Sequence, residues 1–180
     1  MGSDSFDLSE FEYRFLNIQE ISERKNIDTL IKGFMEATQG MDRKRACLTL
    51  KLASYSENRL DNFGKRIAKI RKSLGIEQNE HCPIFVYGEI LSDELMNVFM
   101  NKFTHYISAS YVEGWDMSMA RMDAMEKQLI VPNHSAYPEY LQHGHFVSAK
   151  PIPCNQKGAL NRLYHNANWF EIDYTEFVSK

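Results

Sequence analysis

The stretch "VEGWDMSMARMDAMEKQLIVPNHSAYPEYL", residues 112–141, sets an acid, a glycine and a tryptophan before a methionine-rich segment and an apolar run. The preceding "THYISAS" (residues 104–110) is typical of a strand, residues 116–127 predict a helix, and "QLIVP" predicts the next strand. Glu113 and Gly114 then directly follow a strand and precede a helix. This order predicts a β-α-β unit with parallel strands.

The same alternation runs along the rest of the chain. Ile27, Leu30, Ile31 and Phe34 share one helical face, and Ser92 is positioned to cap another helix. We predict further strands at residues 13–19, 46–52, 82–88 and 145–150, further helices at residues 22–40, 60–74 and 92–103 and from Asp173, a short helix or turn at residues 135–141, and a loop at residues 150–168. The pattern predicts an α/β fold with a parallel sheet of five or six strands and helices on both faces.

Composition limits the classes of protein. The chain has 180 residues, 43% of them hydrophobic, enough for one domain with a core, and its formal charge of −3 argues against nucleic-acid binding through bulk charge. Its apolar runs are too short for a membrane span, and it starts without a signal-peptide pattern. Cys47, Cys82 and Cys154 form neither a disulfide pattern nor a metal pattern. We therefore expect a cytoplasmic protein without a metal or another cofactor.

Three cations lie where strands are predicted to end. Arg24 and Lys25 follow the first strand, and Lys51 ends the second. Because the carboxyl ends of parallel strands meet at one edge, these cations are positioned either to converge on a phosphate-bearing ligand or to form ordinary surface charge. The sequence contains neither a P-loop nor a dinucleotide-binding glycine motif, so an anion would be bound by side chains and by a helix N-terminus.

The turn at Glu113 and Gly114 also has two interpretations. Glycine allows a ligand close to the backbone, the amides of the following helix would attract an anion, and Glu113 would accept hydrogen bonds from hydroxyl groups. The alternative is an ordinary turn. We assign the methionines of the helix to core packing and the pair His143 and His145 to the surface. The methionines are Met117, Met119, Met122 and Met125.

Four segments, taken in order, resemble a known family. They are "FLNIQEISERKNIDTLIKGF", "CLTLKLASYS", "PIFVYGEILSDELMNVF" and "SASYVEGWDMSMARMDAMEKQLIVPNHSAYPEYL". Together they resemble the C-terminal half of family 4 (group 1) glycosyltransferases of the GT-B fold, from about Tyr13 to the end of the chain. The resemblance implies a Rossmann-like domain that binds a sugar nucleotide.

The resemblance also implies roles for individual residues. Glu113 matches the first acid of the family's E-x7-E motif, at the donor sugar, and with Lys51 it would act in catalysis. Residues 139–141 match a stretch that packs beneath the site. The implied donor-binding residues are Arg24, Lys25, Gly114, Trp115 and Arg121.

The chain departs from the family pattern at several positions. Arg121 stands where the second acid of E-x7-E, which holds the ribose hydroxyls, is expected. Asp123 lies about 200° farther around the helix and cannot replace that acid. The expected small turn before Glu113 is Tyr111-Val112, and Met125 and Glu126 replace small residues.

These observations give a first functional hypothesis. Residues 1–12 would be an N-terminal extension or an expression-derived start, and residues 13–180 a single sugar-nucleotide-binding domain. It would belong to a retaining glycosyltransferase of polysaccharide biosynthesis that uses a nucleotide-diphosphate sugar and a glycan, lipid or other acceptor. Because 180 residues leave no room for the N-terminal acceptor domain, we expect a fragment that is inactive alone.

Two other functions remain open. Arg121 favours a degenerate glycosyltransferase-like domain that acts as a non-catalytic partner or binding module. A flavodoxin-like or response-regulator-like domain is the third, although an early acidic cluster after the first strand is missing.

Overall fold

A parallel sheet with helices around it makes up most of the described chain, residues 6–53, 57–154 and 166–180 of the computed structural model. The strands are β1 (Tyr13–Glu20), β2 (Ala46–Ala53), β3 (Ile84–Tyr87), β4 (His105–Ile107), β5 (Gln128–Pro132), β6 (His145–Val147), β7 (Ala149–Pro153) and β8 (Asn168–Ile172). The helices are η2 (Glu23–Lys25, 3₁₀), α1 (Ile27–Ala37), α2 (Glu57–Leu74), α3 (Asp93–Asn101), α4 (Met117–Ala124), α5 (Tyr137–Tyr140) and α6 (Tyr174–Ser179).

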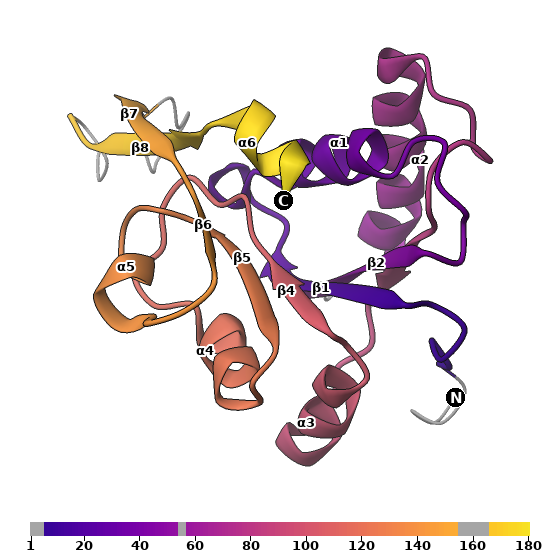
Figure 1. Ribbon diagram of the computed structural model, residues 1–180, viewed down its shortest axis with the longest axis horizontal. Helices are drawn as coiled ribbons and strands as arrows, with labels where there is room; N and C mark the ends of the chain where they lie inside the picture. Colours follow the sequence, from indigo (N-terminus) through magenta and orange to yellow (C-terminus); the bar gives the residue numbers. More distant parts are fainter. Residues whose placement is uncertain (1–5, 54–56, 155–165) are drawn as a thin grey trace.

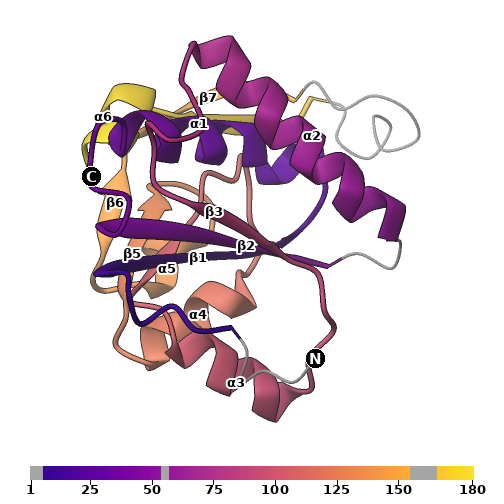
Figure 2. The ribbon, with the colours of Figure 1, turned by 90° about the vertical axis from the view of Figure 1, so that its right-hand side faces the viewer.

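The main sheet has the order β3-β2-β1-β4-β5-β6, and all its pairs are parallel. Helices α1, α2 and α6 cover one face, and α3 and α4 cover the other (Figures 1 and 2). This confirms the predicted α/β fold with a Rossmann-like parallel sheet. Strand order reverses between β1 and β4, the place where ligands bind in such sheets.

The two halves of the sheet are joined by a short ladder. β1 and β2 pair over eight residues, whereas β1 and β4 pair only at Phe15–His105 and Leu16–Tyr106. Beyond Tyr106, side chains rather than backbone ladder bonds connect β1 to β4. The Asn17 side chain donates a hydrogen bond to the Ile107 carbonyl at 2.7 Å. The region beyond the carboxyl ends of β1 and β4 corresponds to the crevice in which doubly wound sheets bind ligands.

Both faces of the strands are buried, which explains their nearly continuous apolar sequences. Alternate residues of β2 point to opposite faces: Leu48, Leu50 and Leu52 pack with α1 and α2, and Cys47 packs in the other core cluster. That second cluster contains Phe99 of α3 and residues of α4. Within the described residues, no helix is both long and apolar enough to cross a membrane.

One predicted boundary was wrong near the candidate site. β4 ends at Ile107 instead of continuing to Ser110, so Glu113 lies six residues beyond the strand instead of directly after it. The Ser108 amide still donates to the Ile130 carbonyl, but the Tyr111 amide donates to the Arg24 carbonyl. The segment leaves the sheet because it contacts the loop that follows β1.

The predicted loop at residues 150–168 was also partly wrong. β7 and β8 form an antiparallel hairpin that includes Pro151 and Pro153, and residues 155–165 of that prediction lie outside the described residues. Two-stranded hairpins leave one edge of each strand unpaired, so proline is tolerated there. The strand predicted at residues 145–150 is divided at Ser148, whose amide donates to the Glu176 carboxylate.

Helix α6 reaches the core through a glycine of α1. A Cβ atom added at Gly33 would lie 2.7 and 2.8 Å from two ring atoms of Phe177, which is buried. Gly64, in α2, is exposed and has nothing within 4 Å of the same position. The two helical glycines therefore form a matched pair.

We expect Gly33→Ala to lower the free energy of unfolding by about 1–2 kcal/mol, because displacement of Phe177 outweighs the gain in helix propensity. Gly64→Ala should raise it by about 0.5–1 kcal/mol. Urea denaturation of both variants measures the difference. A stabilising Gly33→Ala would contradict the close packing of α6 on α1.

Candidate functional site

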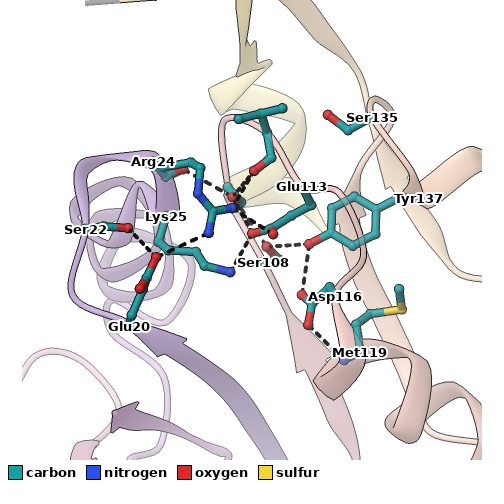
Figure 3. A network of polar contacts seen from close by, with 12 residues as sticks. Glu20, Ser22, Arg24, Lys25, Ser108, Glu113, Asp116, Met119, Ser135 and Tyr137 are labelled. Carbon is teal, nitrogen blue, oxygen red and sulfur yellow. Dashed lines mark hydrogen bonds and ion pairs between the residues drawn. The ribbon is translucent and has the colours of Figure 1, made fainter. Parts of the chain in front are cut away.

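A polar network lies in the crevice where strand order reverses (Figure 3). One side is the loop after β1, which forms η2 and carries Arg24 and Lys25. The other side is residues 108–116, between β4 and α4. Both loops follow the carboxyl ends of adjacent parallel strands, so the sheet topology itself brings them together.

Glu113 is the centre of this network. Its Oε1 accepts hydrogen bonds from Lys25 Nζ and Ser110 Oγ, both at 2.7 Å, and its Oε2 accepts one from Arg24 Nη1 at 2.8 Å. The Glu113 side chain is 5% exposed. Burial raises its pKa, but Lys25, Ser110 and Arg24 outweigh burial and hold the pKa below its usual value. Glu113 is therefore ionised at neutral pH.

Arg24 ties the two loops together at the backbone as well. Its guanidinium donates to the Val112 carbonyl at 2.8 Å, and its own carbonyl accepts a hydrogen bond from the Tyr111 amide and lies 3.1 Å from the Ser110 hydroxyl oxygen. Burial lowers the pKa of Arg24, and Glu113 more than offsets this effect, so the pKa is raised. These contacts hold the guanidinium charge beside Glu113.

Arg24, Lys25 and Glu113 together carry one excess positive charge, before the nearby Asp116 carboxyl group is counted. Arg24 and Lys25 carry two positive charges and Glu113 one negative charge. Glu20 lies 3.3 Å from Arg24, but its side chain is 60% exposed, so water screens that contact. An anionic ligand beside Arg24 and Lys25 would thus meet one excess positive charge, which the Asp116 carboxyl group opposes when it is ionised.

A second buried carboxylate supports the loop from below. Asp116 Oδ2 lies 2.9 Å from the Tyr106 hydroxyl and 3.0 Å from the Tyr137 hydroxyl, and its Oδ1 accepts the Met119 amide. Burial raises the pKa of Asp116, and the Met119 amide and the Tyr106 hydroxyl only partly oppose this effect. Asp116 is the N-cap of α4. We expected the amides at the start of α4 to attract a ligand anion. They lie beside the protein's own Asp116 carboxylate, which reduces that attraction.

His134 fixes the loop from the β5 side. Its Nε2 lies 3.0 Å from the Ser110 carbonyl and its Nδ1 2.8 Å from the Ser135 hydroxyl. Since a carbonyl only accepts, Nε2 carries the proton in the neutral ring. The ring also stacks on Phe170 at 4.9 Å. Burial lowers the pKa of His134 to about 4.

Lys51 lies at the carboxyl end of β2, in register with Ile18 of β1. It is buried, its Nζ donates to the Glu89 carbonyl at 2.6 Å and lies over the Tyr87 ring. Burial lowers the pKa of Lys51. Lys51 is thus at the same end of the sheet as Glu113, and its ammonium is bound to the loop after β3.

The residues that follow Glu113 are more open. A Cβ added at Gly114 would meet nothing within 4 Å, so the local fold leaves space there. Trp115 is 59% exposed and stacks on Tyr140 at 4.0 Å. Arg121 points to α3, where its guanidinium lies 2.9 Å from Asp93.

The assignments of methionine and histidine were mostly right. Met119 and Met122 are buried, and Met125 packs against the same core cluster. Met117 is 63% exposed, so its assignment to the core was wrong; it is the first residue of α4 and precedes the buried face. His143 and His145 are exposed, as predicted. No group of side chains in the described residues is arranged to hold a metal ion.

Several members of the network had no prediction from sequence. The small polar residues at the end of "THYISAS" and the acid that begins α4 are signals for a strand end and a helix cap, respectively. No sequence signal predicts that His134, 24 residues after Ser110, contacts the loop that contains Ser110. The members that were missed are Ser108, Ser110, Asp116, His134 and Tyr137.

No protein-family model matches the chain, and no curated protein matches its sequence. Solved structures do match. The chain aligns with a trehalose 6-phosphate synthase from Burkholderia multivorans (TM-score 0.64, 9% identity), covering 96% of this chain and 34% of that one. It also aligns with the C-terminal domain of a group 1 glycosyl transferase from Francisella tularensis (TM-score 0.55, 19% identity), covering 77% and 68%.

A third match is the N-terminal domain of a trehalose-6-phosphate phosphatase from Candida albicans (TM-score 0.58, 13% identity), covering 78% of this chain and 31% of that one. The chain thus spans about a third of the two trehalose-related proteins. At these identities the matches establish the fold. It is the fold of the C-terminal half of GT-B glycosyltransferases, in agreement with the resemblance read from the sequence.

We expect Glu113→Gln to lower the free energy of unfolding by about 3 kcal/mol, because it leaves two largely buried cations without their counter-charge. Glu12→Gln is the matched control, since Glu12 pairs with Arg45 at an exposed position and should change stability by no more than about 0.5 kcal/mol. If urea denaturation showed the same loss of unfolding free energy for Glu113→Gln and Glu12→Gln, the central role of Glu113 would be contradicted.

The lowered pKa of His134 predicts a pH dependence of stability. The usual value is 6.5 and the folded value about 4, so the unfolded chain binds the proton first as pH falls. The contribution of neutral His134 is complete above about pH 6.5 and is lost as pH falls toward about 4. We expect His134→Phe, which keeps a ring against Phe170, to flatten the fall of the free energy of unfolding across this window.

The control for this experiment is Ile90→Phe, which adds a ring at an exposed position without changing a titratable group. Its pH dependence should follow that of the unmodified protein. Urea denaturation at half-unit steps of pH measures both slopes. If His134→Phe retains the original slope, the titration belongs to other groups.

Proposed function

We propose that this chain is the sugar-nucleotide-binding domain of a retaining glycosyltransferase, which transfers a sugar from a nucleotide-diphosphate donor to a glycan, lipid or other acceptor. One observation carries the proposal. In a fold shared with glycosyltransferases, Arg24 and Lys25 meet Glu113 at the point where strand order reverses. Cations suit a diphosphate and a carboxylate suits sugar hydroxyls, so the pair of chemistries fits a nucleotide sugar.

The acceptor capacity of Glu113 supports its role at the donor sugar. A carboxylate has about four acceptor positions, two on each oxygen. Oε1 already accepts from Lys25 and Ser110, whereas Oε2 accepts only from Arg24. One position on Oε2 is left for a ligand hydroxyl, and a Cβ atom added at the next residue, Gly114, would meet nothing within 4 Å.

The cations would act on the leaving group. Arg24, Lys25 and Lys51 would bind the diphosphate, and Lys51 would stabilise the charge that develops there as the glycosidic bond breaks. Lys51 is the only one of the three that contacts no carboxylate within hydrogen-bonding distance in the described residues; it donates to a carbonyl. Trp115 and Arg121 would border the nucleoside side of the site.

The acceptor would be bound by a separate domain. This chain supplies one wall of a two-domain cleft, and transfer depends on holding both substrates together and excluding water. Alone, the chain would bind donor weakly and transfer no sugar at a useful rate. A role in polysaccharide biosynthesis in the cytoplasm would be consistent with such an enzyme.

A non-catalytic binding module is the second candidate, and two observations favour it. Arg121, in place of an acid, is engaged by Asp93, and Glu113 already neutralises one of the two neighbouring cations. A domain in which these pairs are purely structural would keep the fold and lose the donor. Titration with UDP-, GDP- and ADP-glucose separates the two functions, since only the first predicts saturable binding.

We expect Lys51→Ala to weaken binding of the nucleotide sugar by about 1–3 kcal/mol, the usual cost of a lost charged hydrogen bond. Isothermal titration calorimetry measures the change, and circular dichroism checks that the variant is folded. Lys69→Ala, at an exposed position of α2, is the control and should bind as the unmodified chain does. Unchanged affinity in a folded Lys51→Ala variant would reject the donor-site assignment.

A further inference from the structure

A groove lies beside α1, on the face of the sheet that carries α6. Residues of α1, of β8 and of the start of α6 line a cavity of about 720 Å³. A second cavity, of about 400 Å³, shares with it four lining residues: Asn26, Thr29, Lys32 and Tyr111. Because they share this wall, the two cavities form one groove.

A fixed aromatic ring stands at the junction of the two cavities. Tyr111 stacks on Trp169 with ring centroids 4.9 Å apart and an angle of 14° between the planes. The Tyr111 amide donates to the Arg24 carbonyl, and its carbonyl accepts from the Phe170 amide. Since backbone and ring are both held, Tyr111 lines the groove as a fixed aromatic residue.

Hydrogen-bonding groups and charged groups of both signs line the larger cavity. Lys32 has no hydrogen-bond or ion-pair partner in the described residues. Lys150 and Glu171 form an ion pair at 3.3 Å whose side chains are 73% and 48% exposed, so the pair is available to a ligand. The Tyr174 hydroxyl donates to Glu36 at 2.8 Å. Hydrogen-bonding groups thus surround the aromatic ring.

The charges of this cavity exclude two classes of ligand. Two cations, Lys32 and Lys150, face three carboxylates, so the formal charge is −1 and a phosphate-bearing ligand is disfavoured; the carboxylates are Glu36, Glu171 and Asp173. An apolar ligand would cover charged groups without satisfying them. A neutral ligand with many hydroxyls can donate to the carboxylates and accept from Lys32.

We propose that this groove binds a neutral oligosaccharide, separately from the nucleotide-sugar site proposed above. The C–H groups of a sugar ring would pack on the face of Tyr111, because the face of an aromatic ring is its negative pole. Sugar hydroxyls would bind Lys32 and Glu171. The volume of the larger cavity lies within the range of small-molecule sites.

A nuclear magnetic resonance titration tests this proposal. The full chain, labelled with nitrogen-15, is titrated with maltotriose, cellotriose and chitotriose. Saturable shifts are expected at the amides of Lys32, Tyr111 and Glu171 for at least one of these sugars. Lys32→Met and Glu171→Gln should each weaken that binding by about fivefold or more, the effect of one lost hydrogen bond. The control, Lys69→Met, should leave it unchanged.

Three outcomes would overturn the proposal. The first is the absence of saturable shifts with all three sugars. The second is binding that Lys25→Met abolishes and that folded Lys32→Met and Glu171→Gln variants retain, which would place the sugar at the Glu113 network. The third is stronger binding of inorganic phosphate than of the sugars at the same amides. The spectrum of each variant shows whether it is folded.

Discussion

The buried carboxylate of Glu113 holds together the carboxyl end of the sheet. The reversal of strand order leaves β1 and β4 paired at only two positions, and the chain beyond them would separate without other contacts. Glu113 draws Arg24 and Lys25 of one loop onto the other loop, and the backbone hydrogen bond from the Tyr111 amide to the Arg24 carbonyl joins the loops at the same place. In low dielectric such a contact is strong only while both partners remain.

The same interaction sets the chemistry of the crevice. A carboxylate that neutralises one of two cations leaves a small positive excess and one free acceptor position on Oε2. A diphosphate ligand would be a second anion bound by Arg24 and Lys25. The same two cations would therefore bind the ligand and hold the loops together. Asp116, buried beneath the loop, accepts hydrogen bonds from the Tyr106 and Tyr137 hydroxyls and so links the start of α4 to β4 and α5.

The loop of residues 108–116 also connects two surfaces. Glu113 faces the crevice, whereas Tyr111, two residues earlier, lines the groove beside α1. Both residues are held to Arg24, one through its side chain and one through its amide. A ligand on either surface would therefore contact the same loop. Because both surfaces fix the position of this loop, it has little freedom to move at one surface without moving at the other.

The sequence by itself determined the fold class and the order of most elements. Alternation of apolar strands with helices of one apolar face implies a parallel sheet, and Arg24, Lys25 and Glu113 were predicted near one end because they follow strands. These are local patterns, which short-range periodicity encodes. The hairpin of β7 and β8 escaped this kind of reasoning because its prolines are typical of loops.

Only the tertiary structure decided which side chains meet. Glu113 and Lys25 are 88 residues apart, and Ser110 and His134 are 24 apart, so their contacts depend on strand order and on where β4 ends. Likewise, Lys51 binds a carbonyl, and Arg121 binds Asp93. In each pairing, the cost of removing the charged groups from water is offset by the attraction between them. Both depend on the folded surroundings, which the spacing of residues along the chain does not determine.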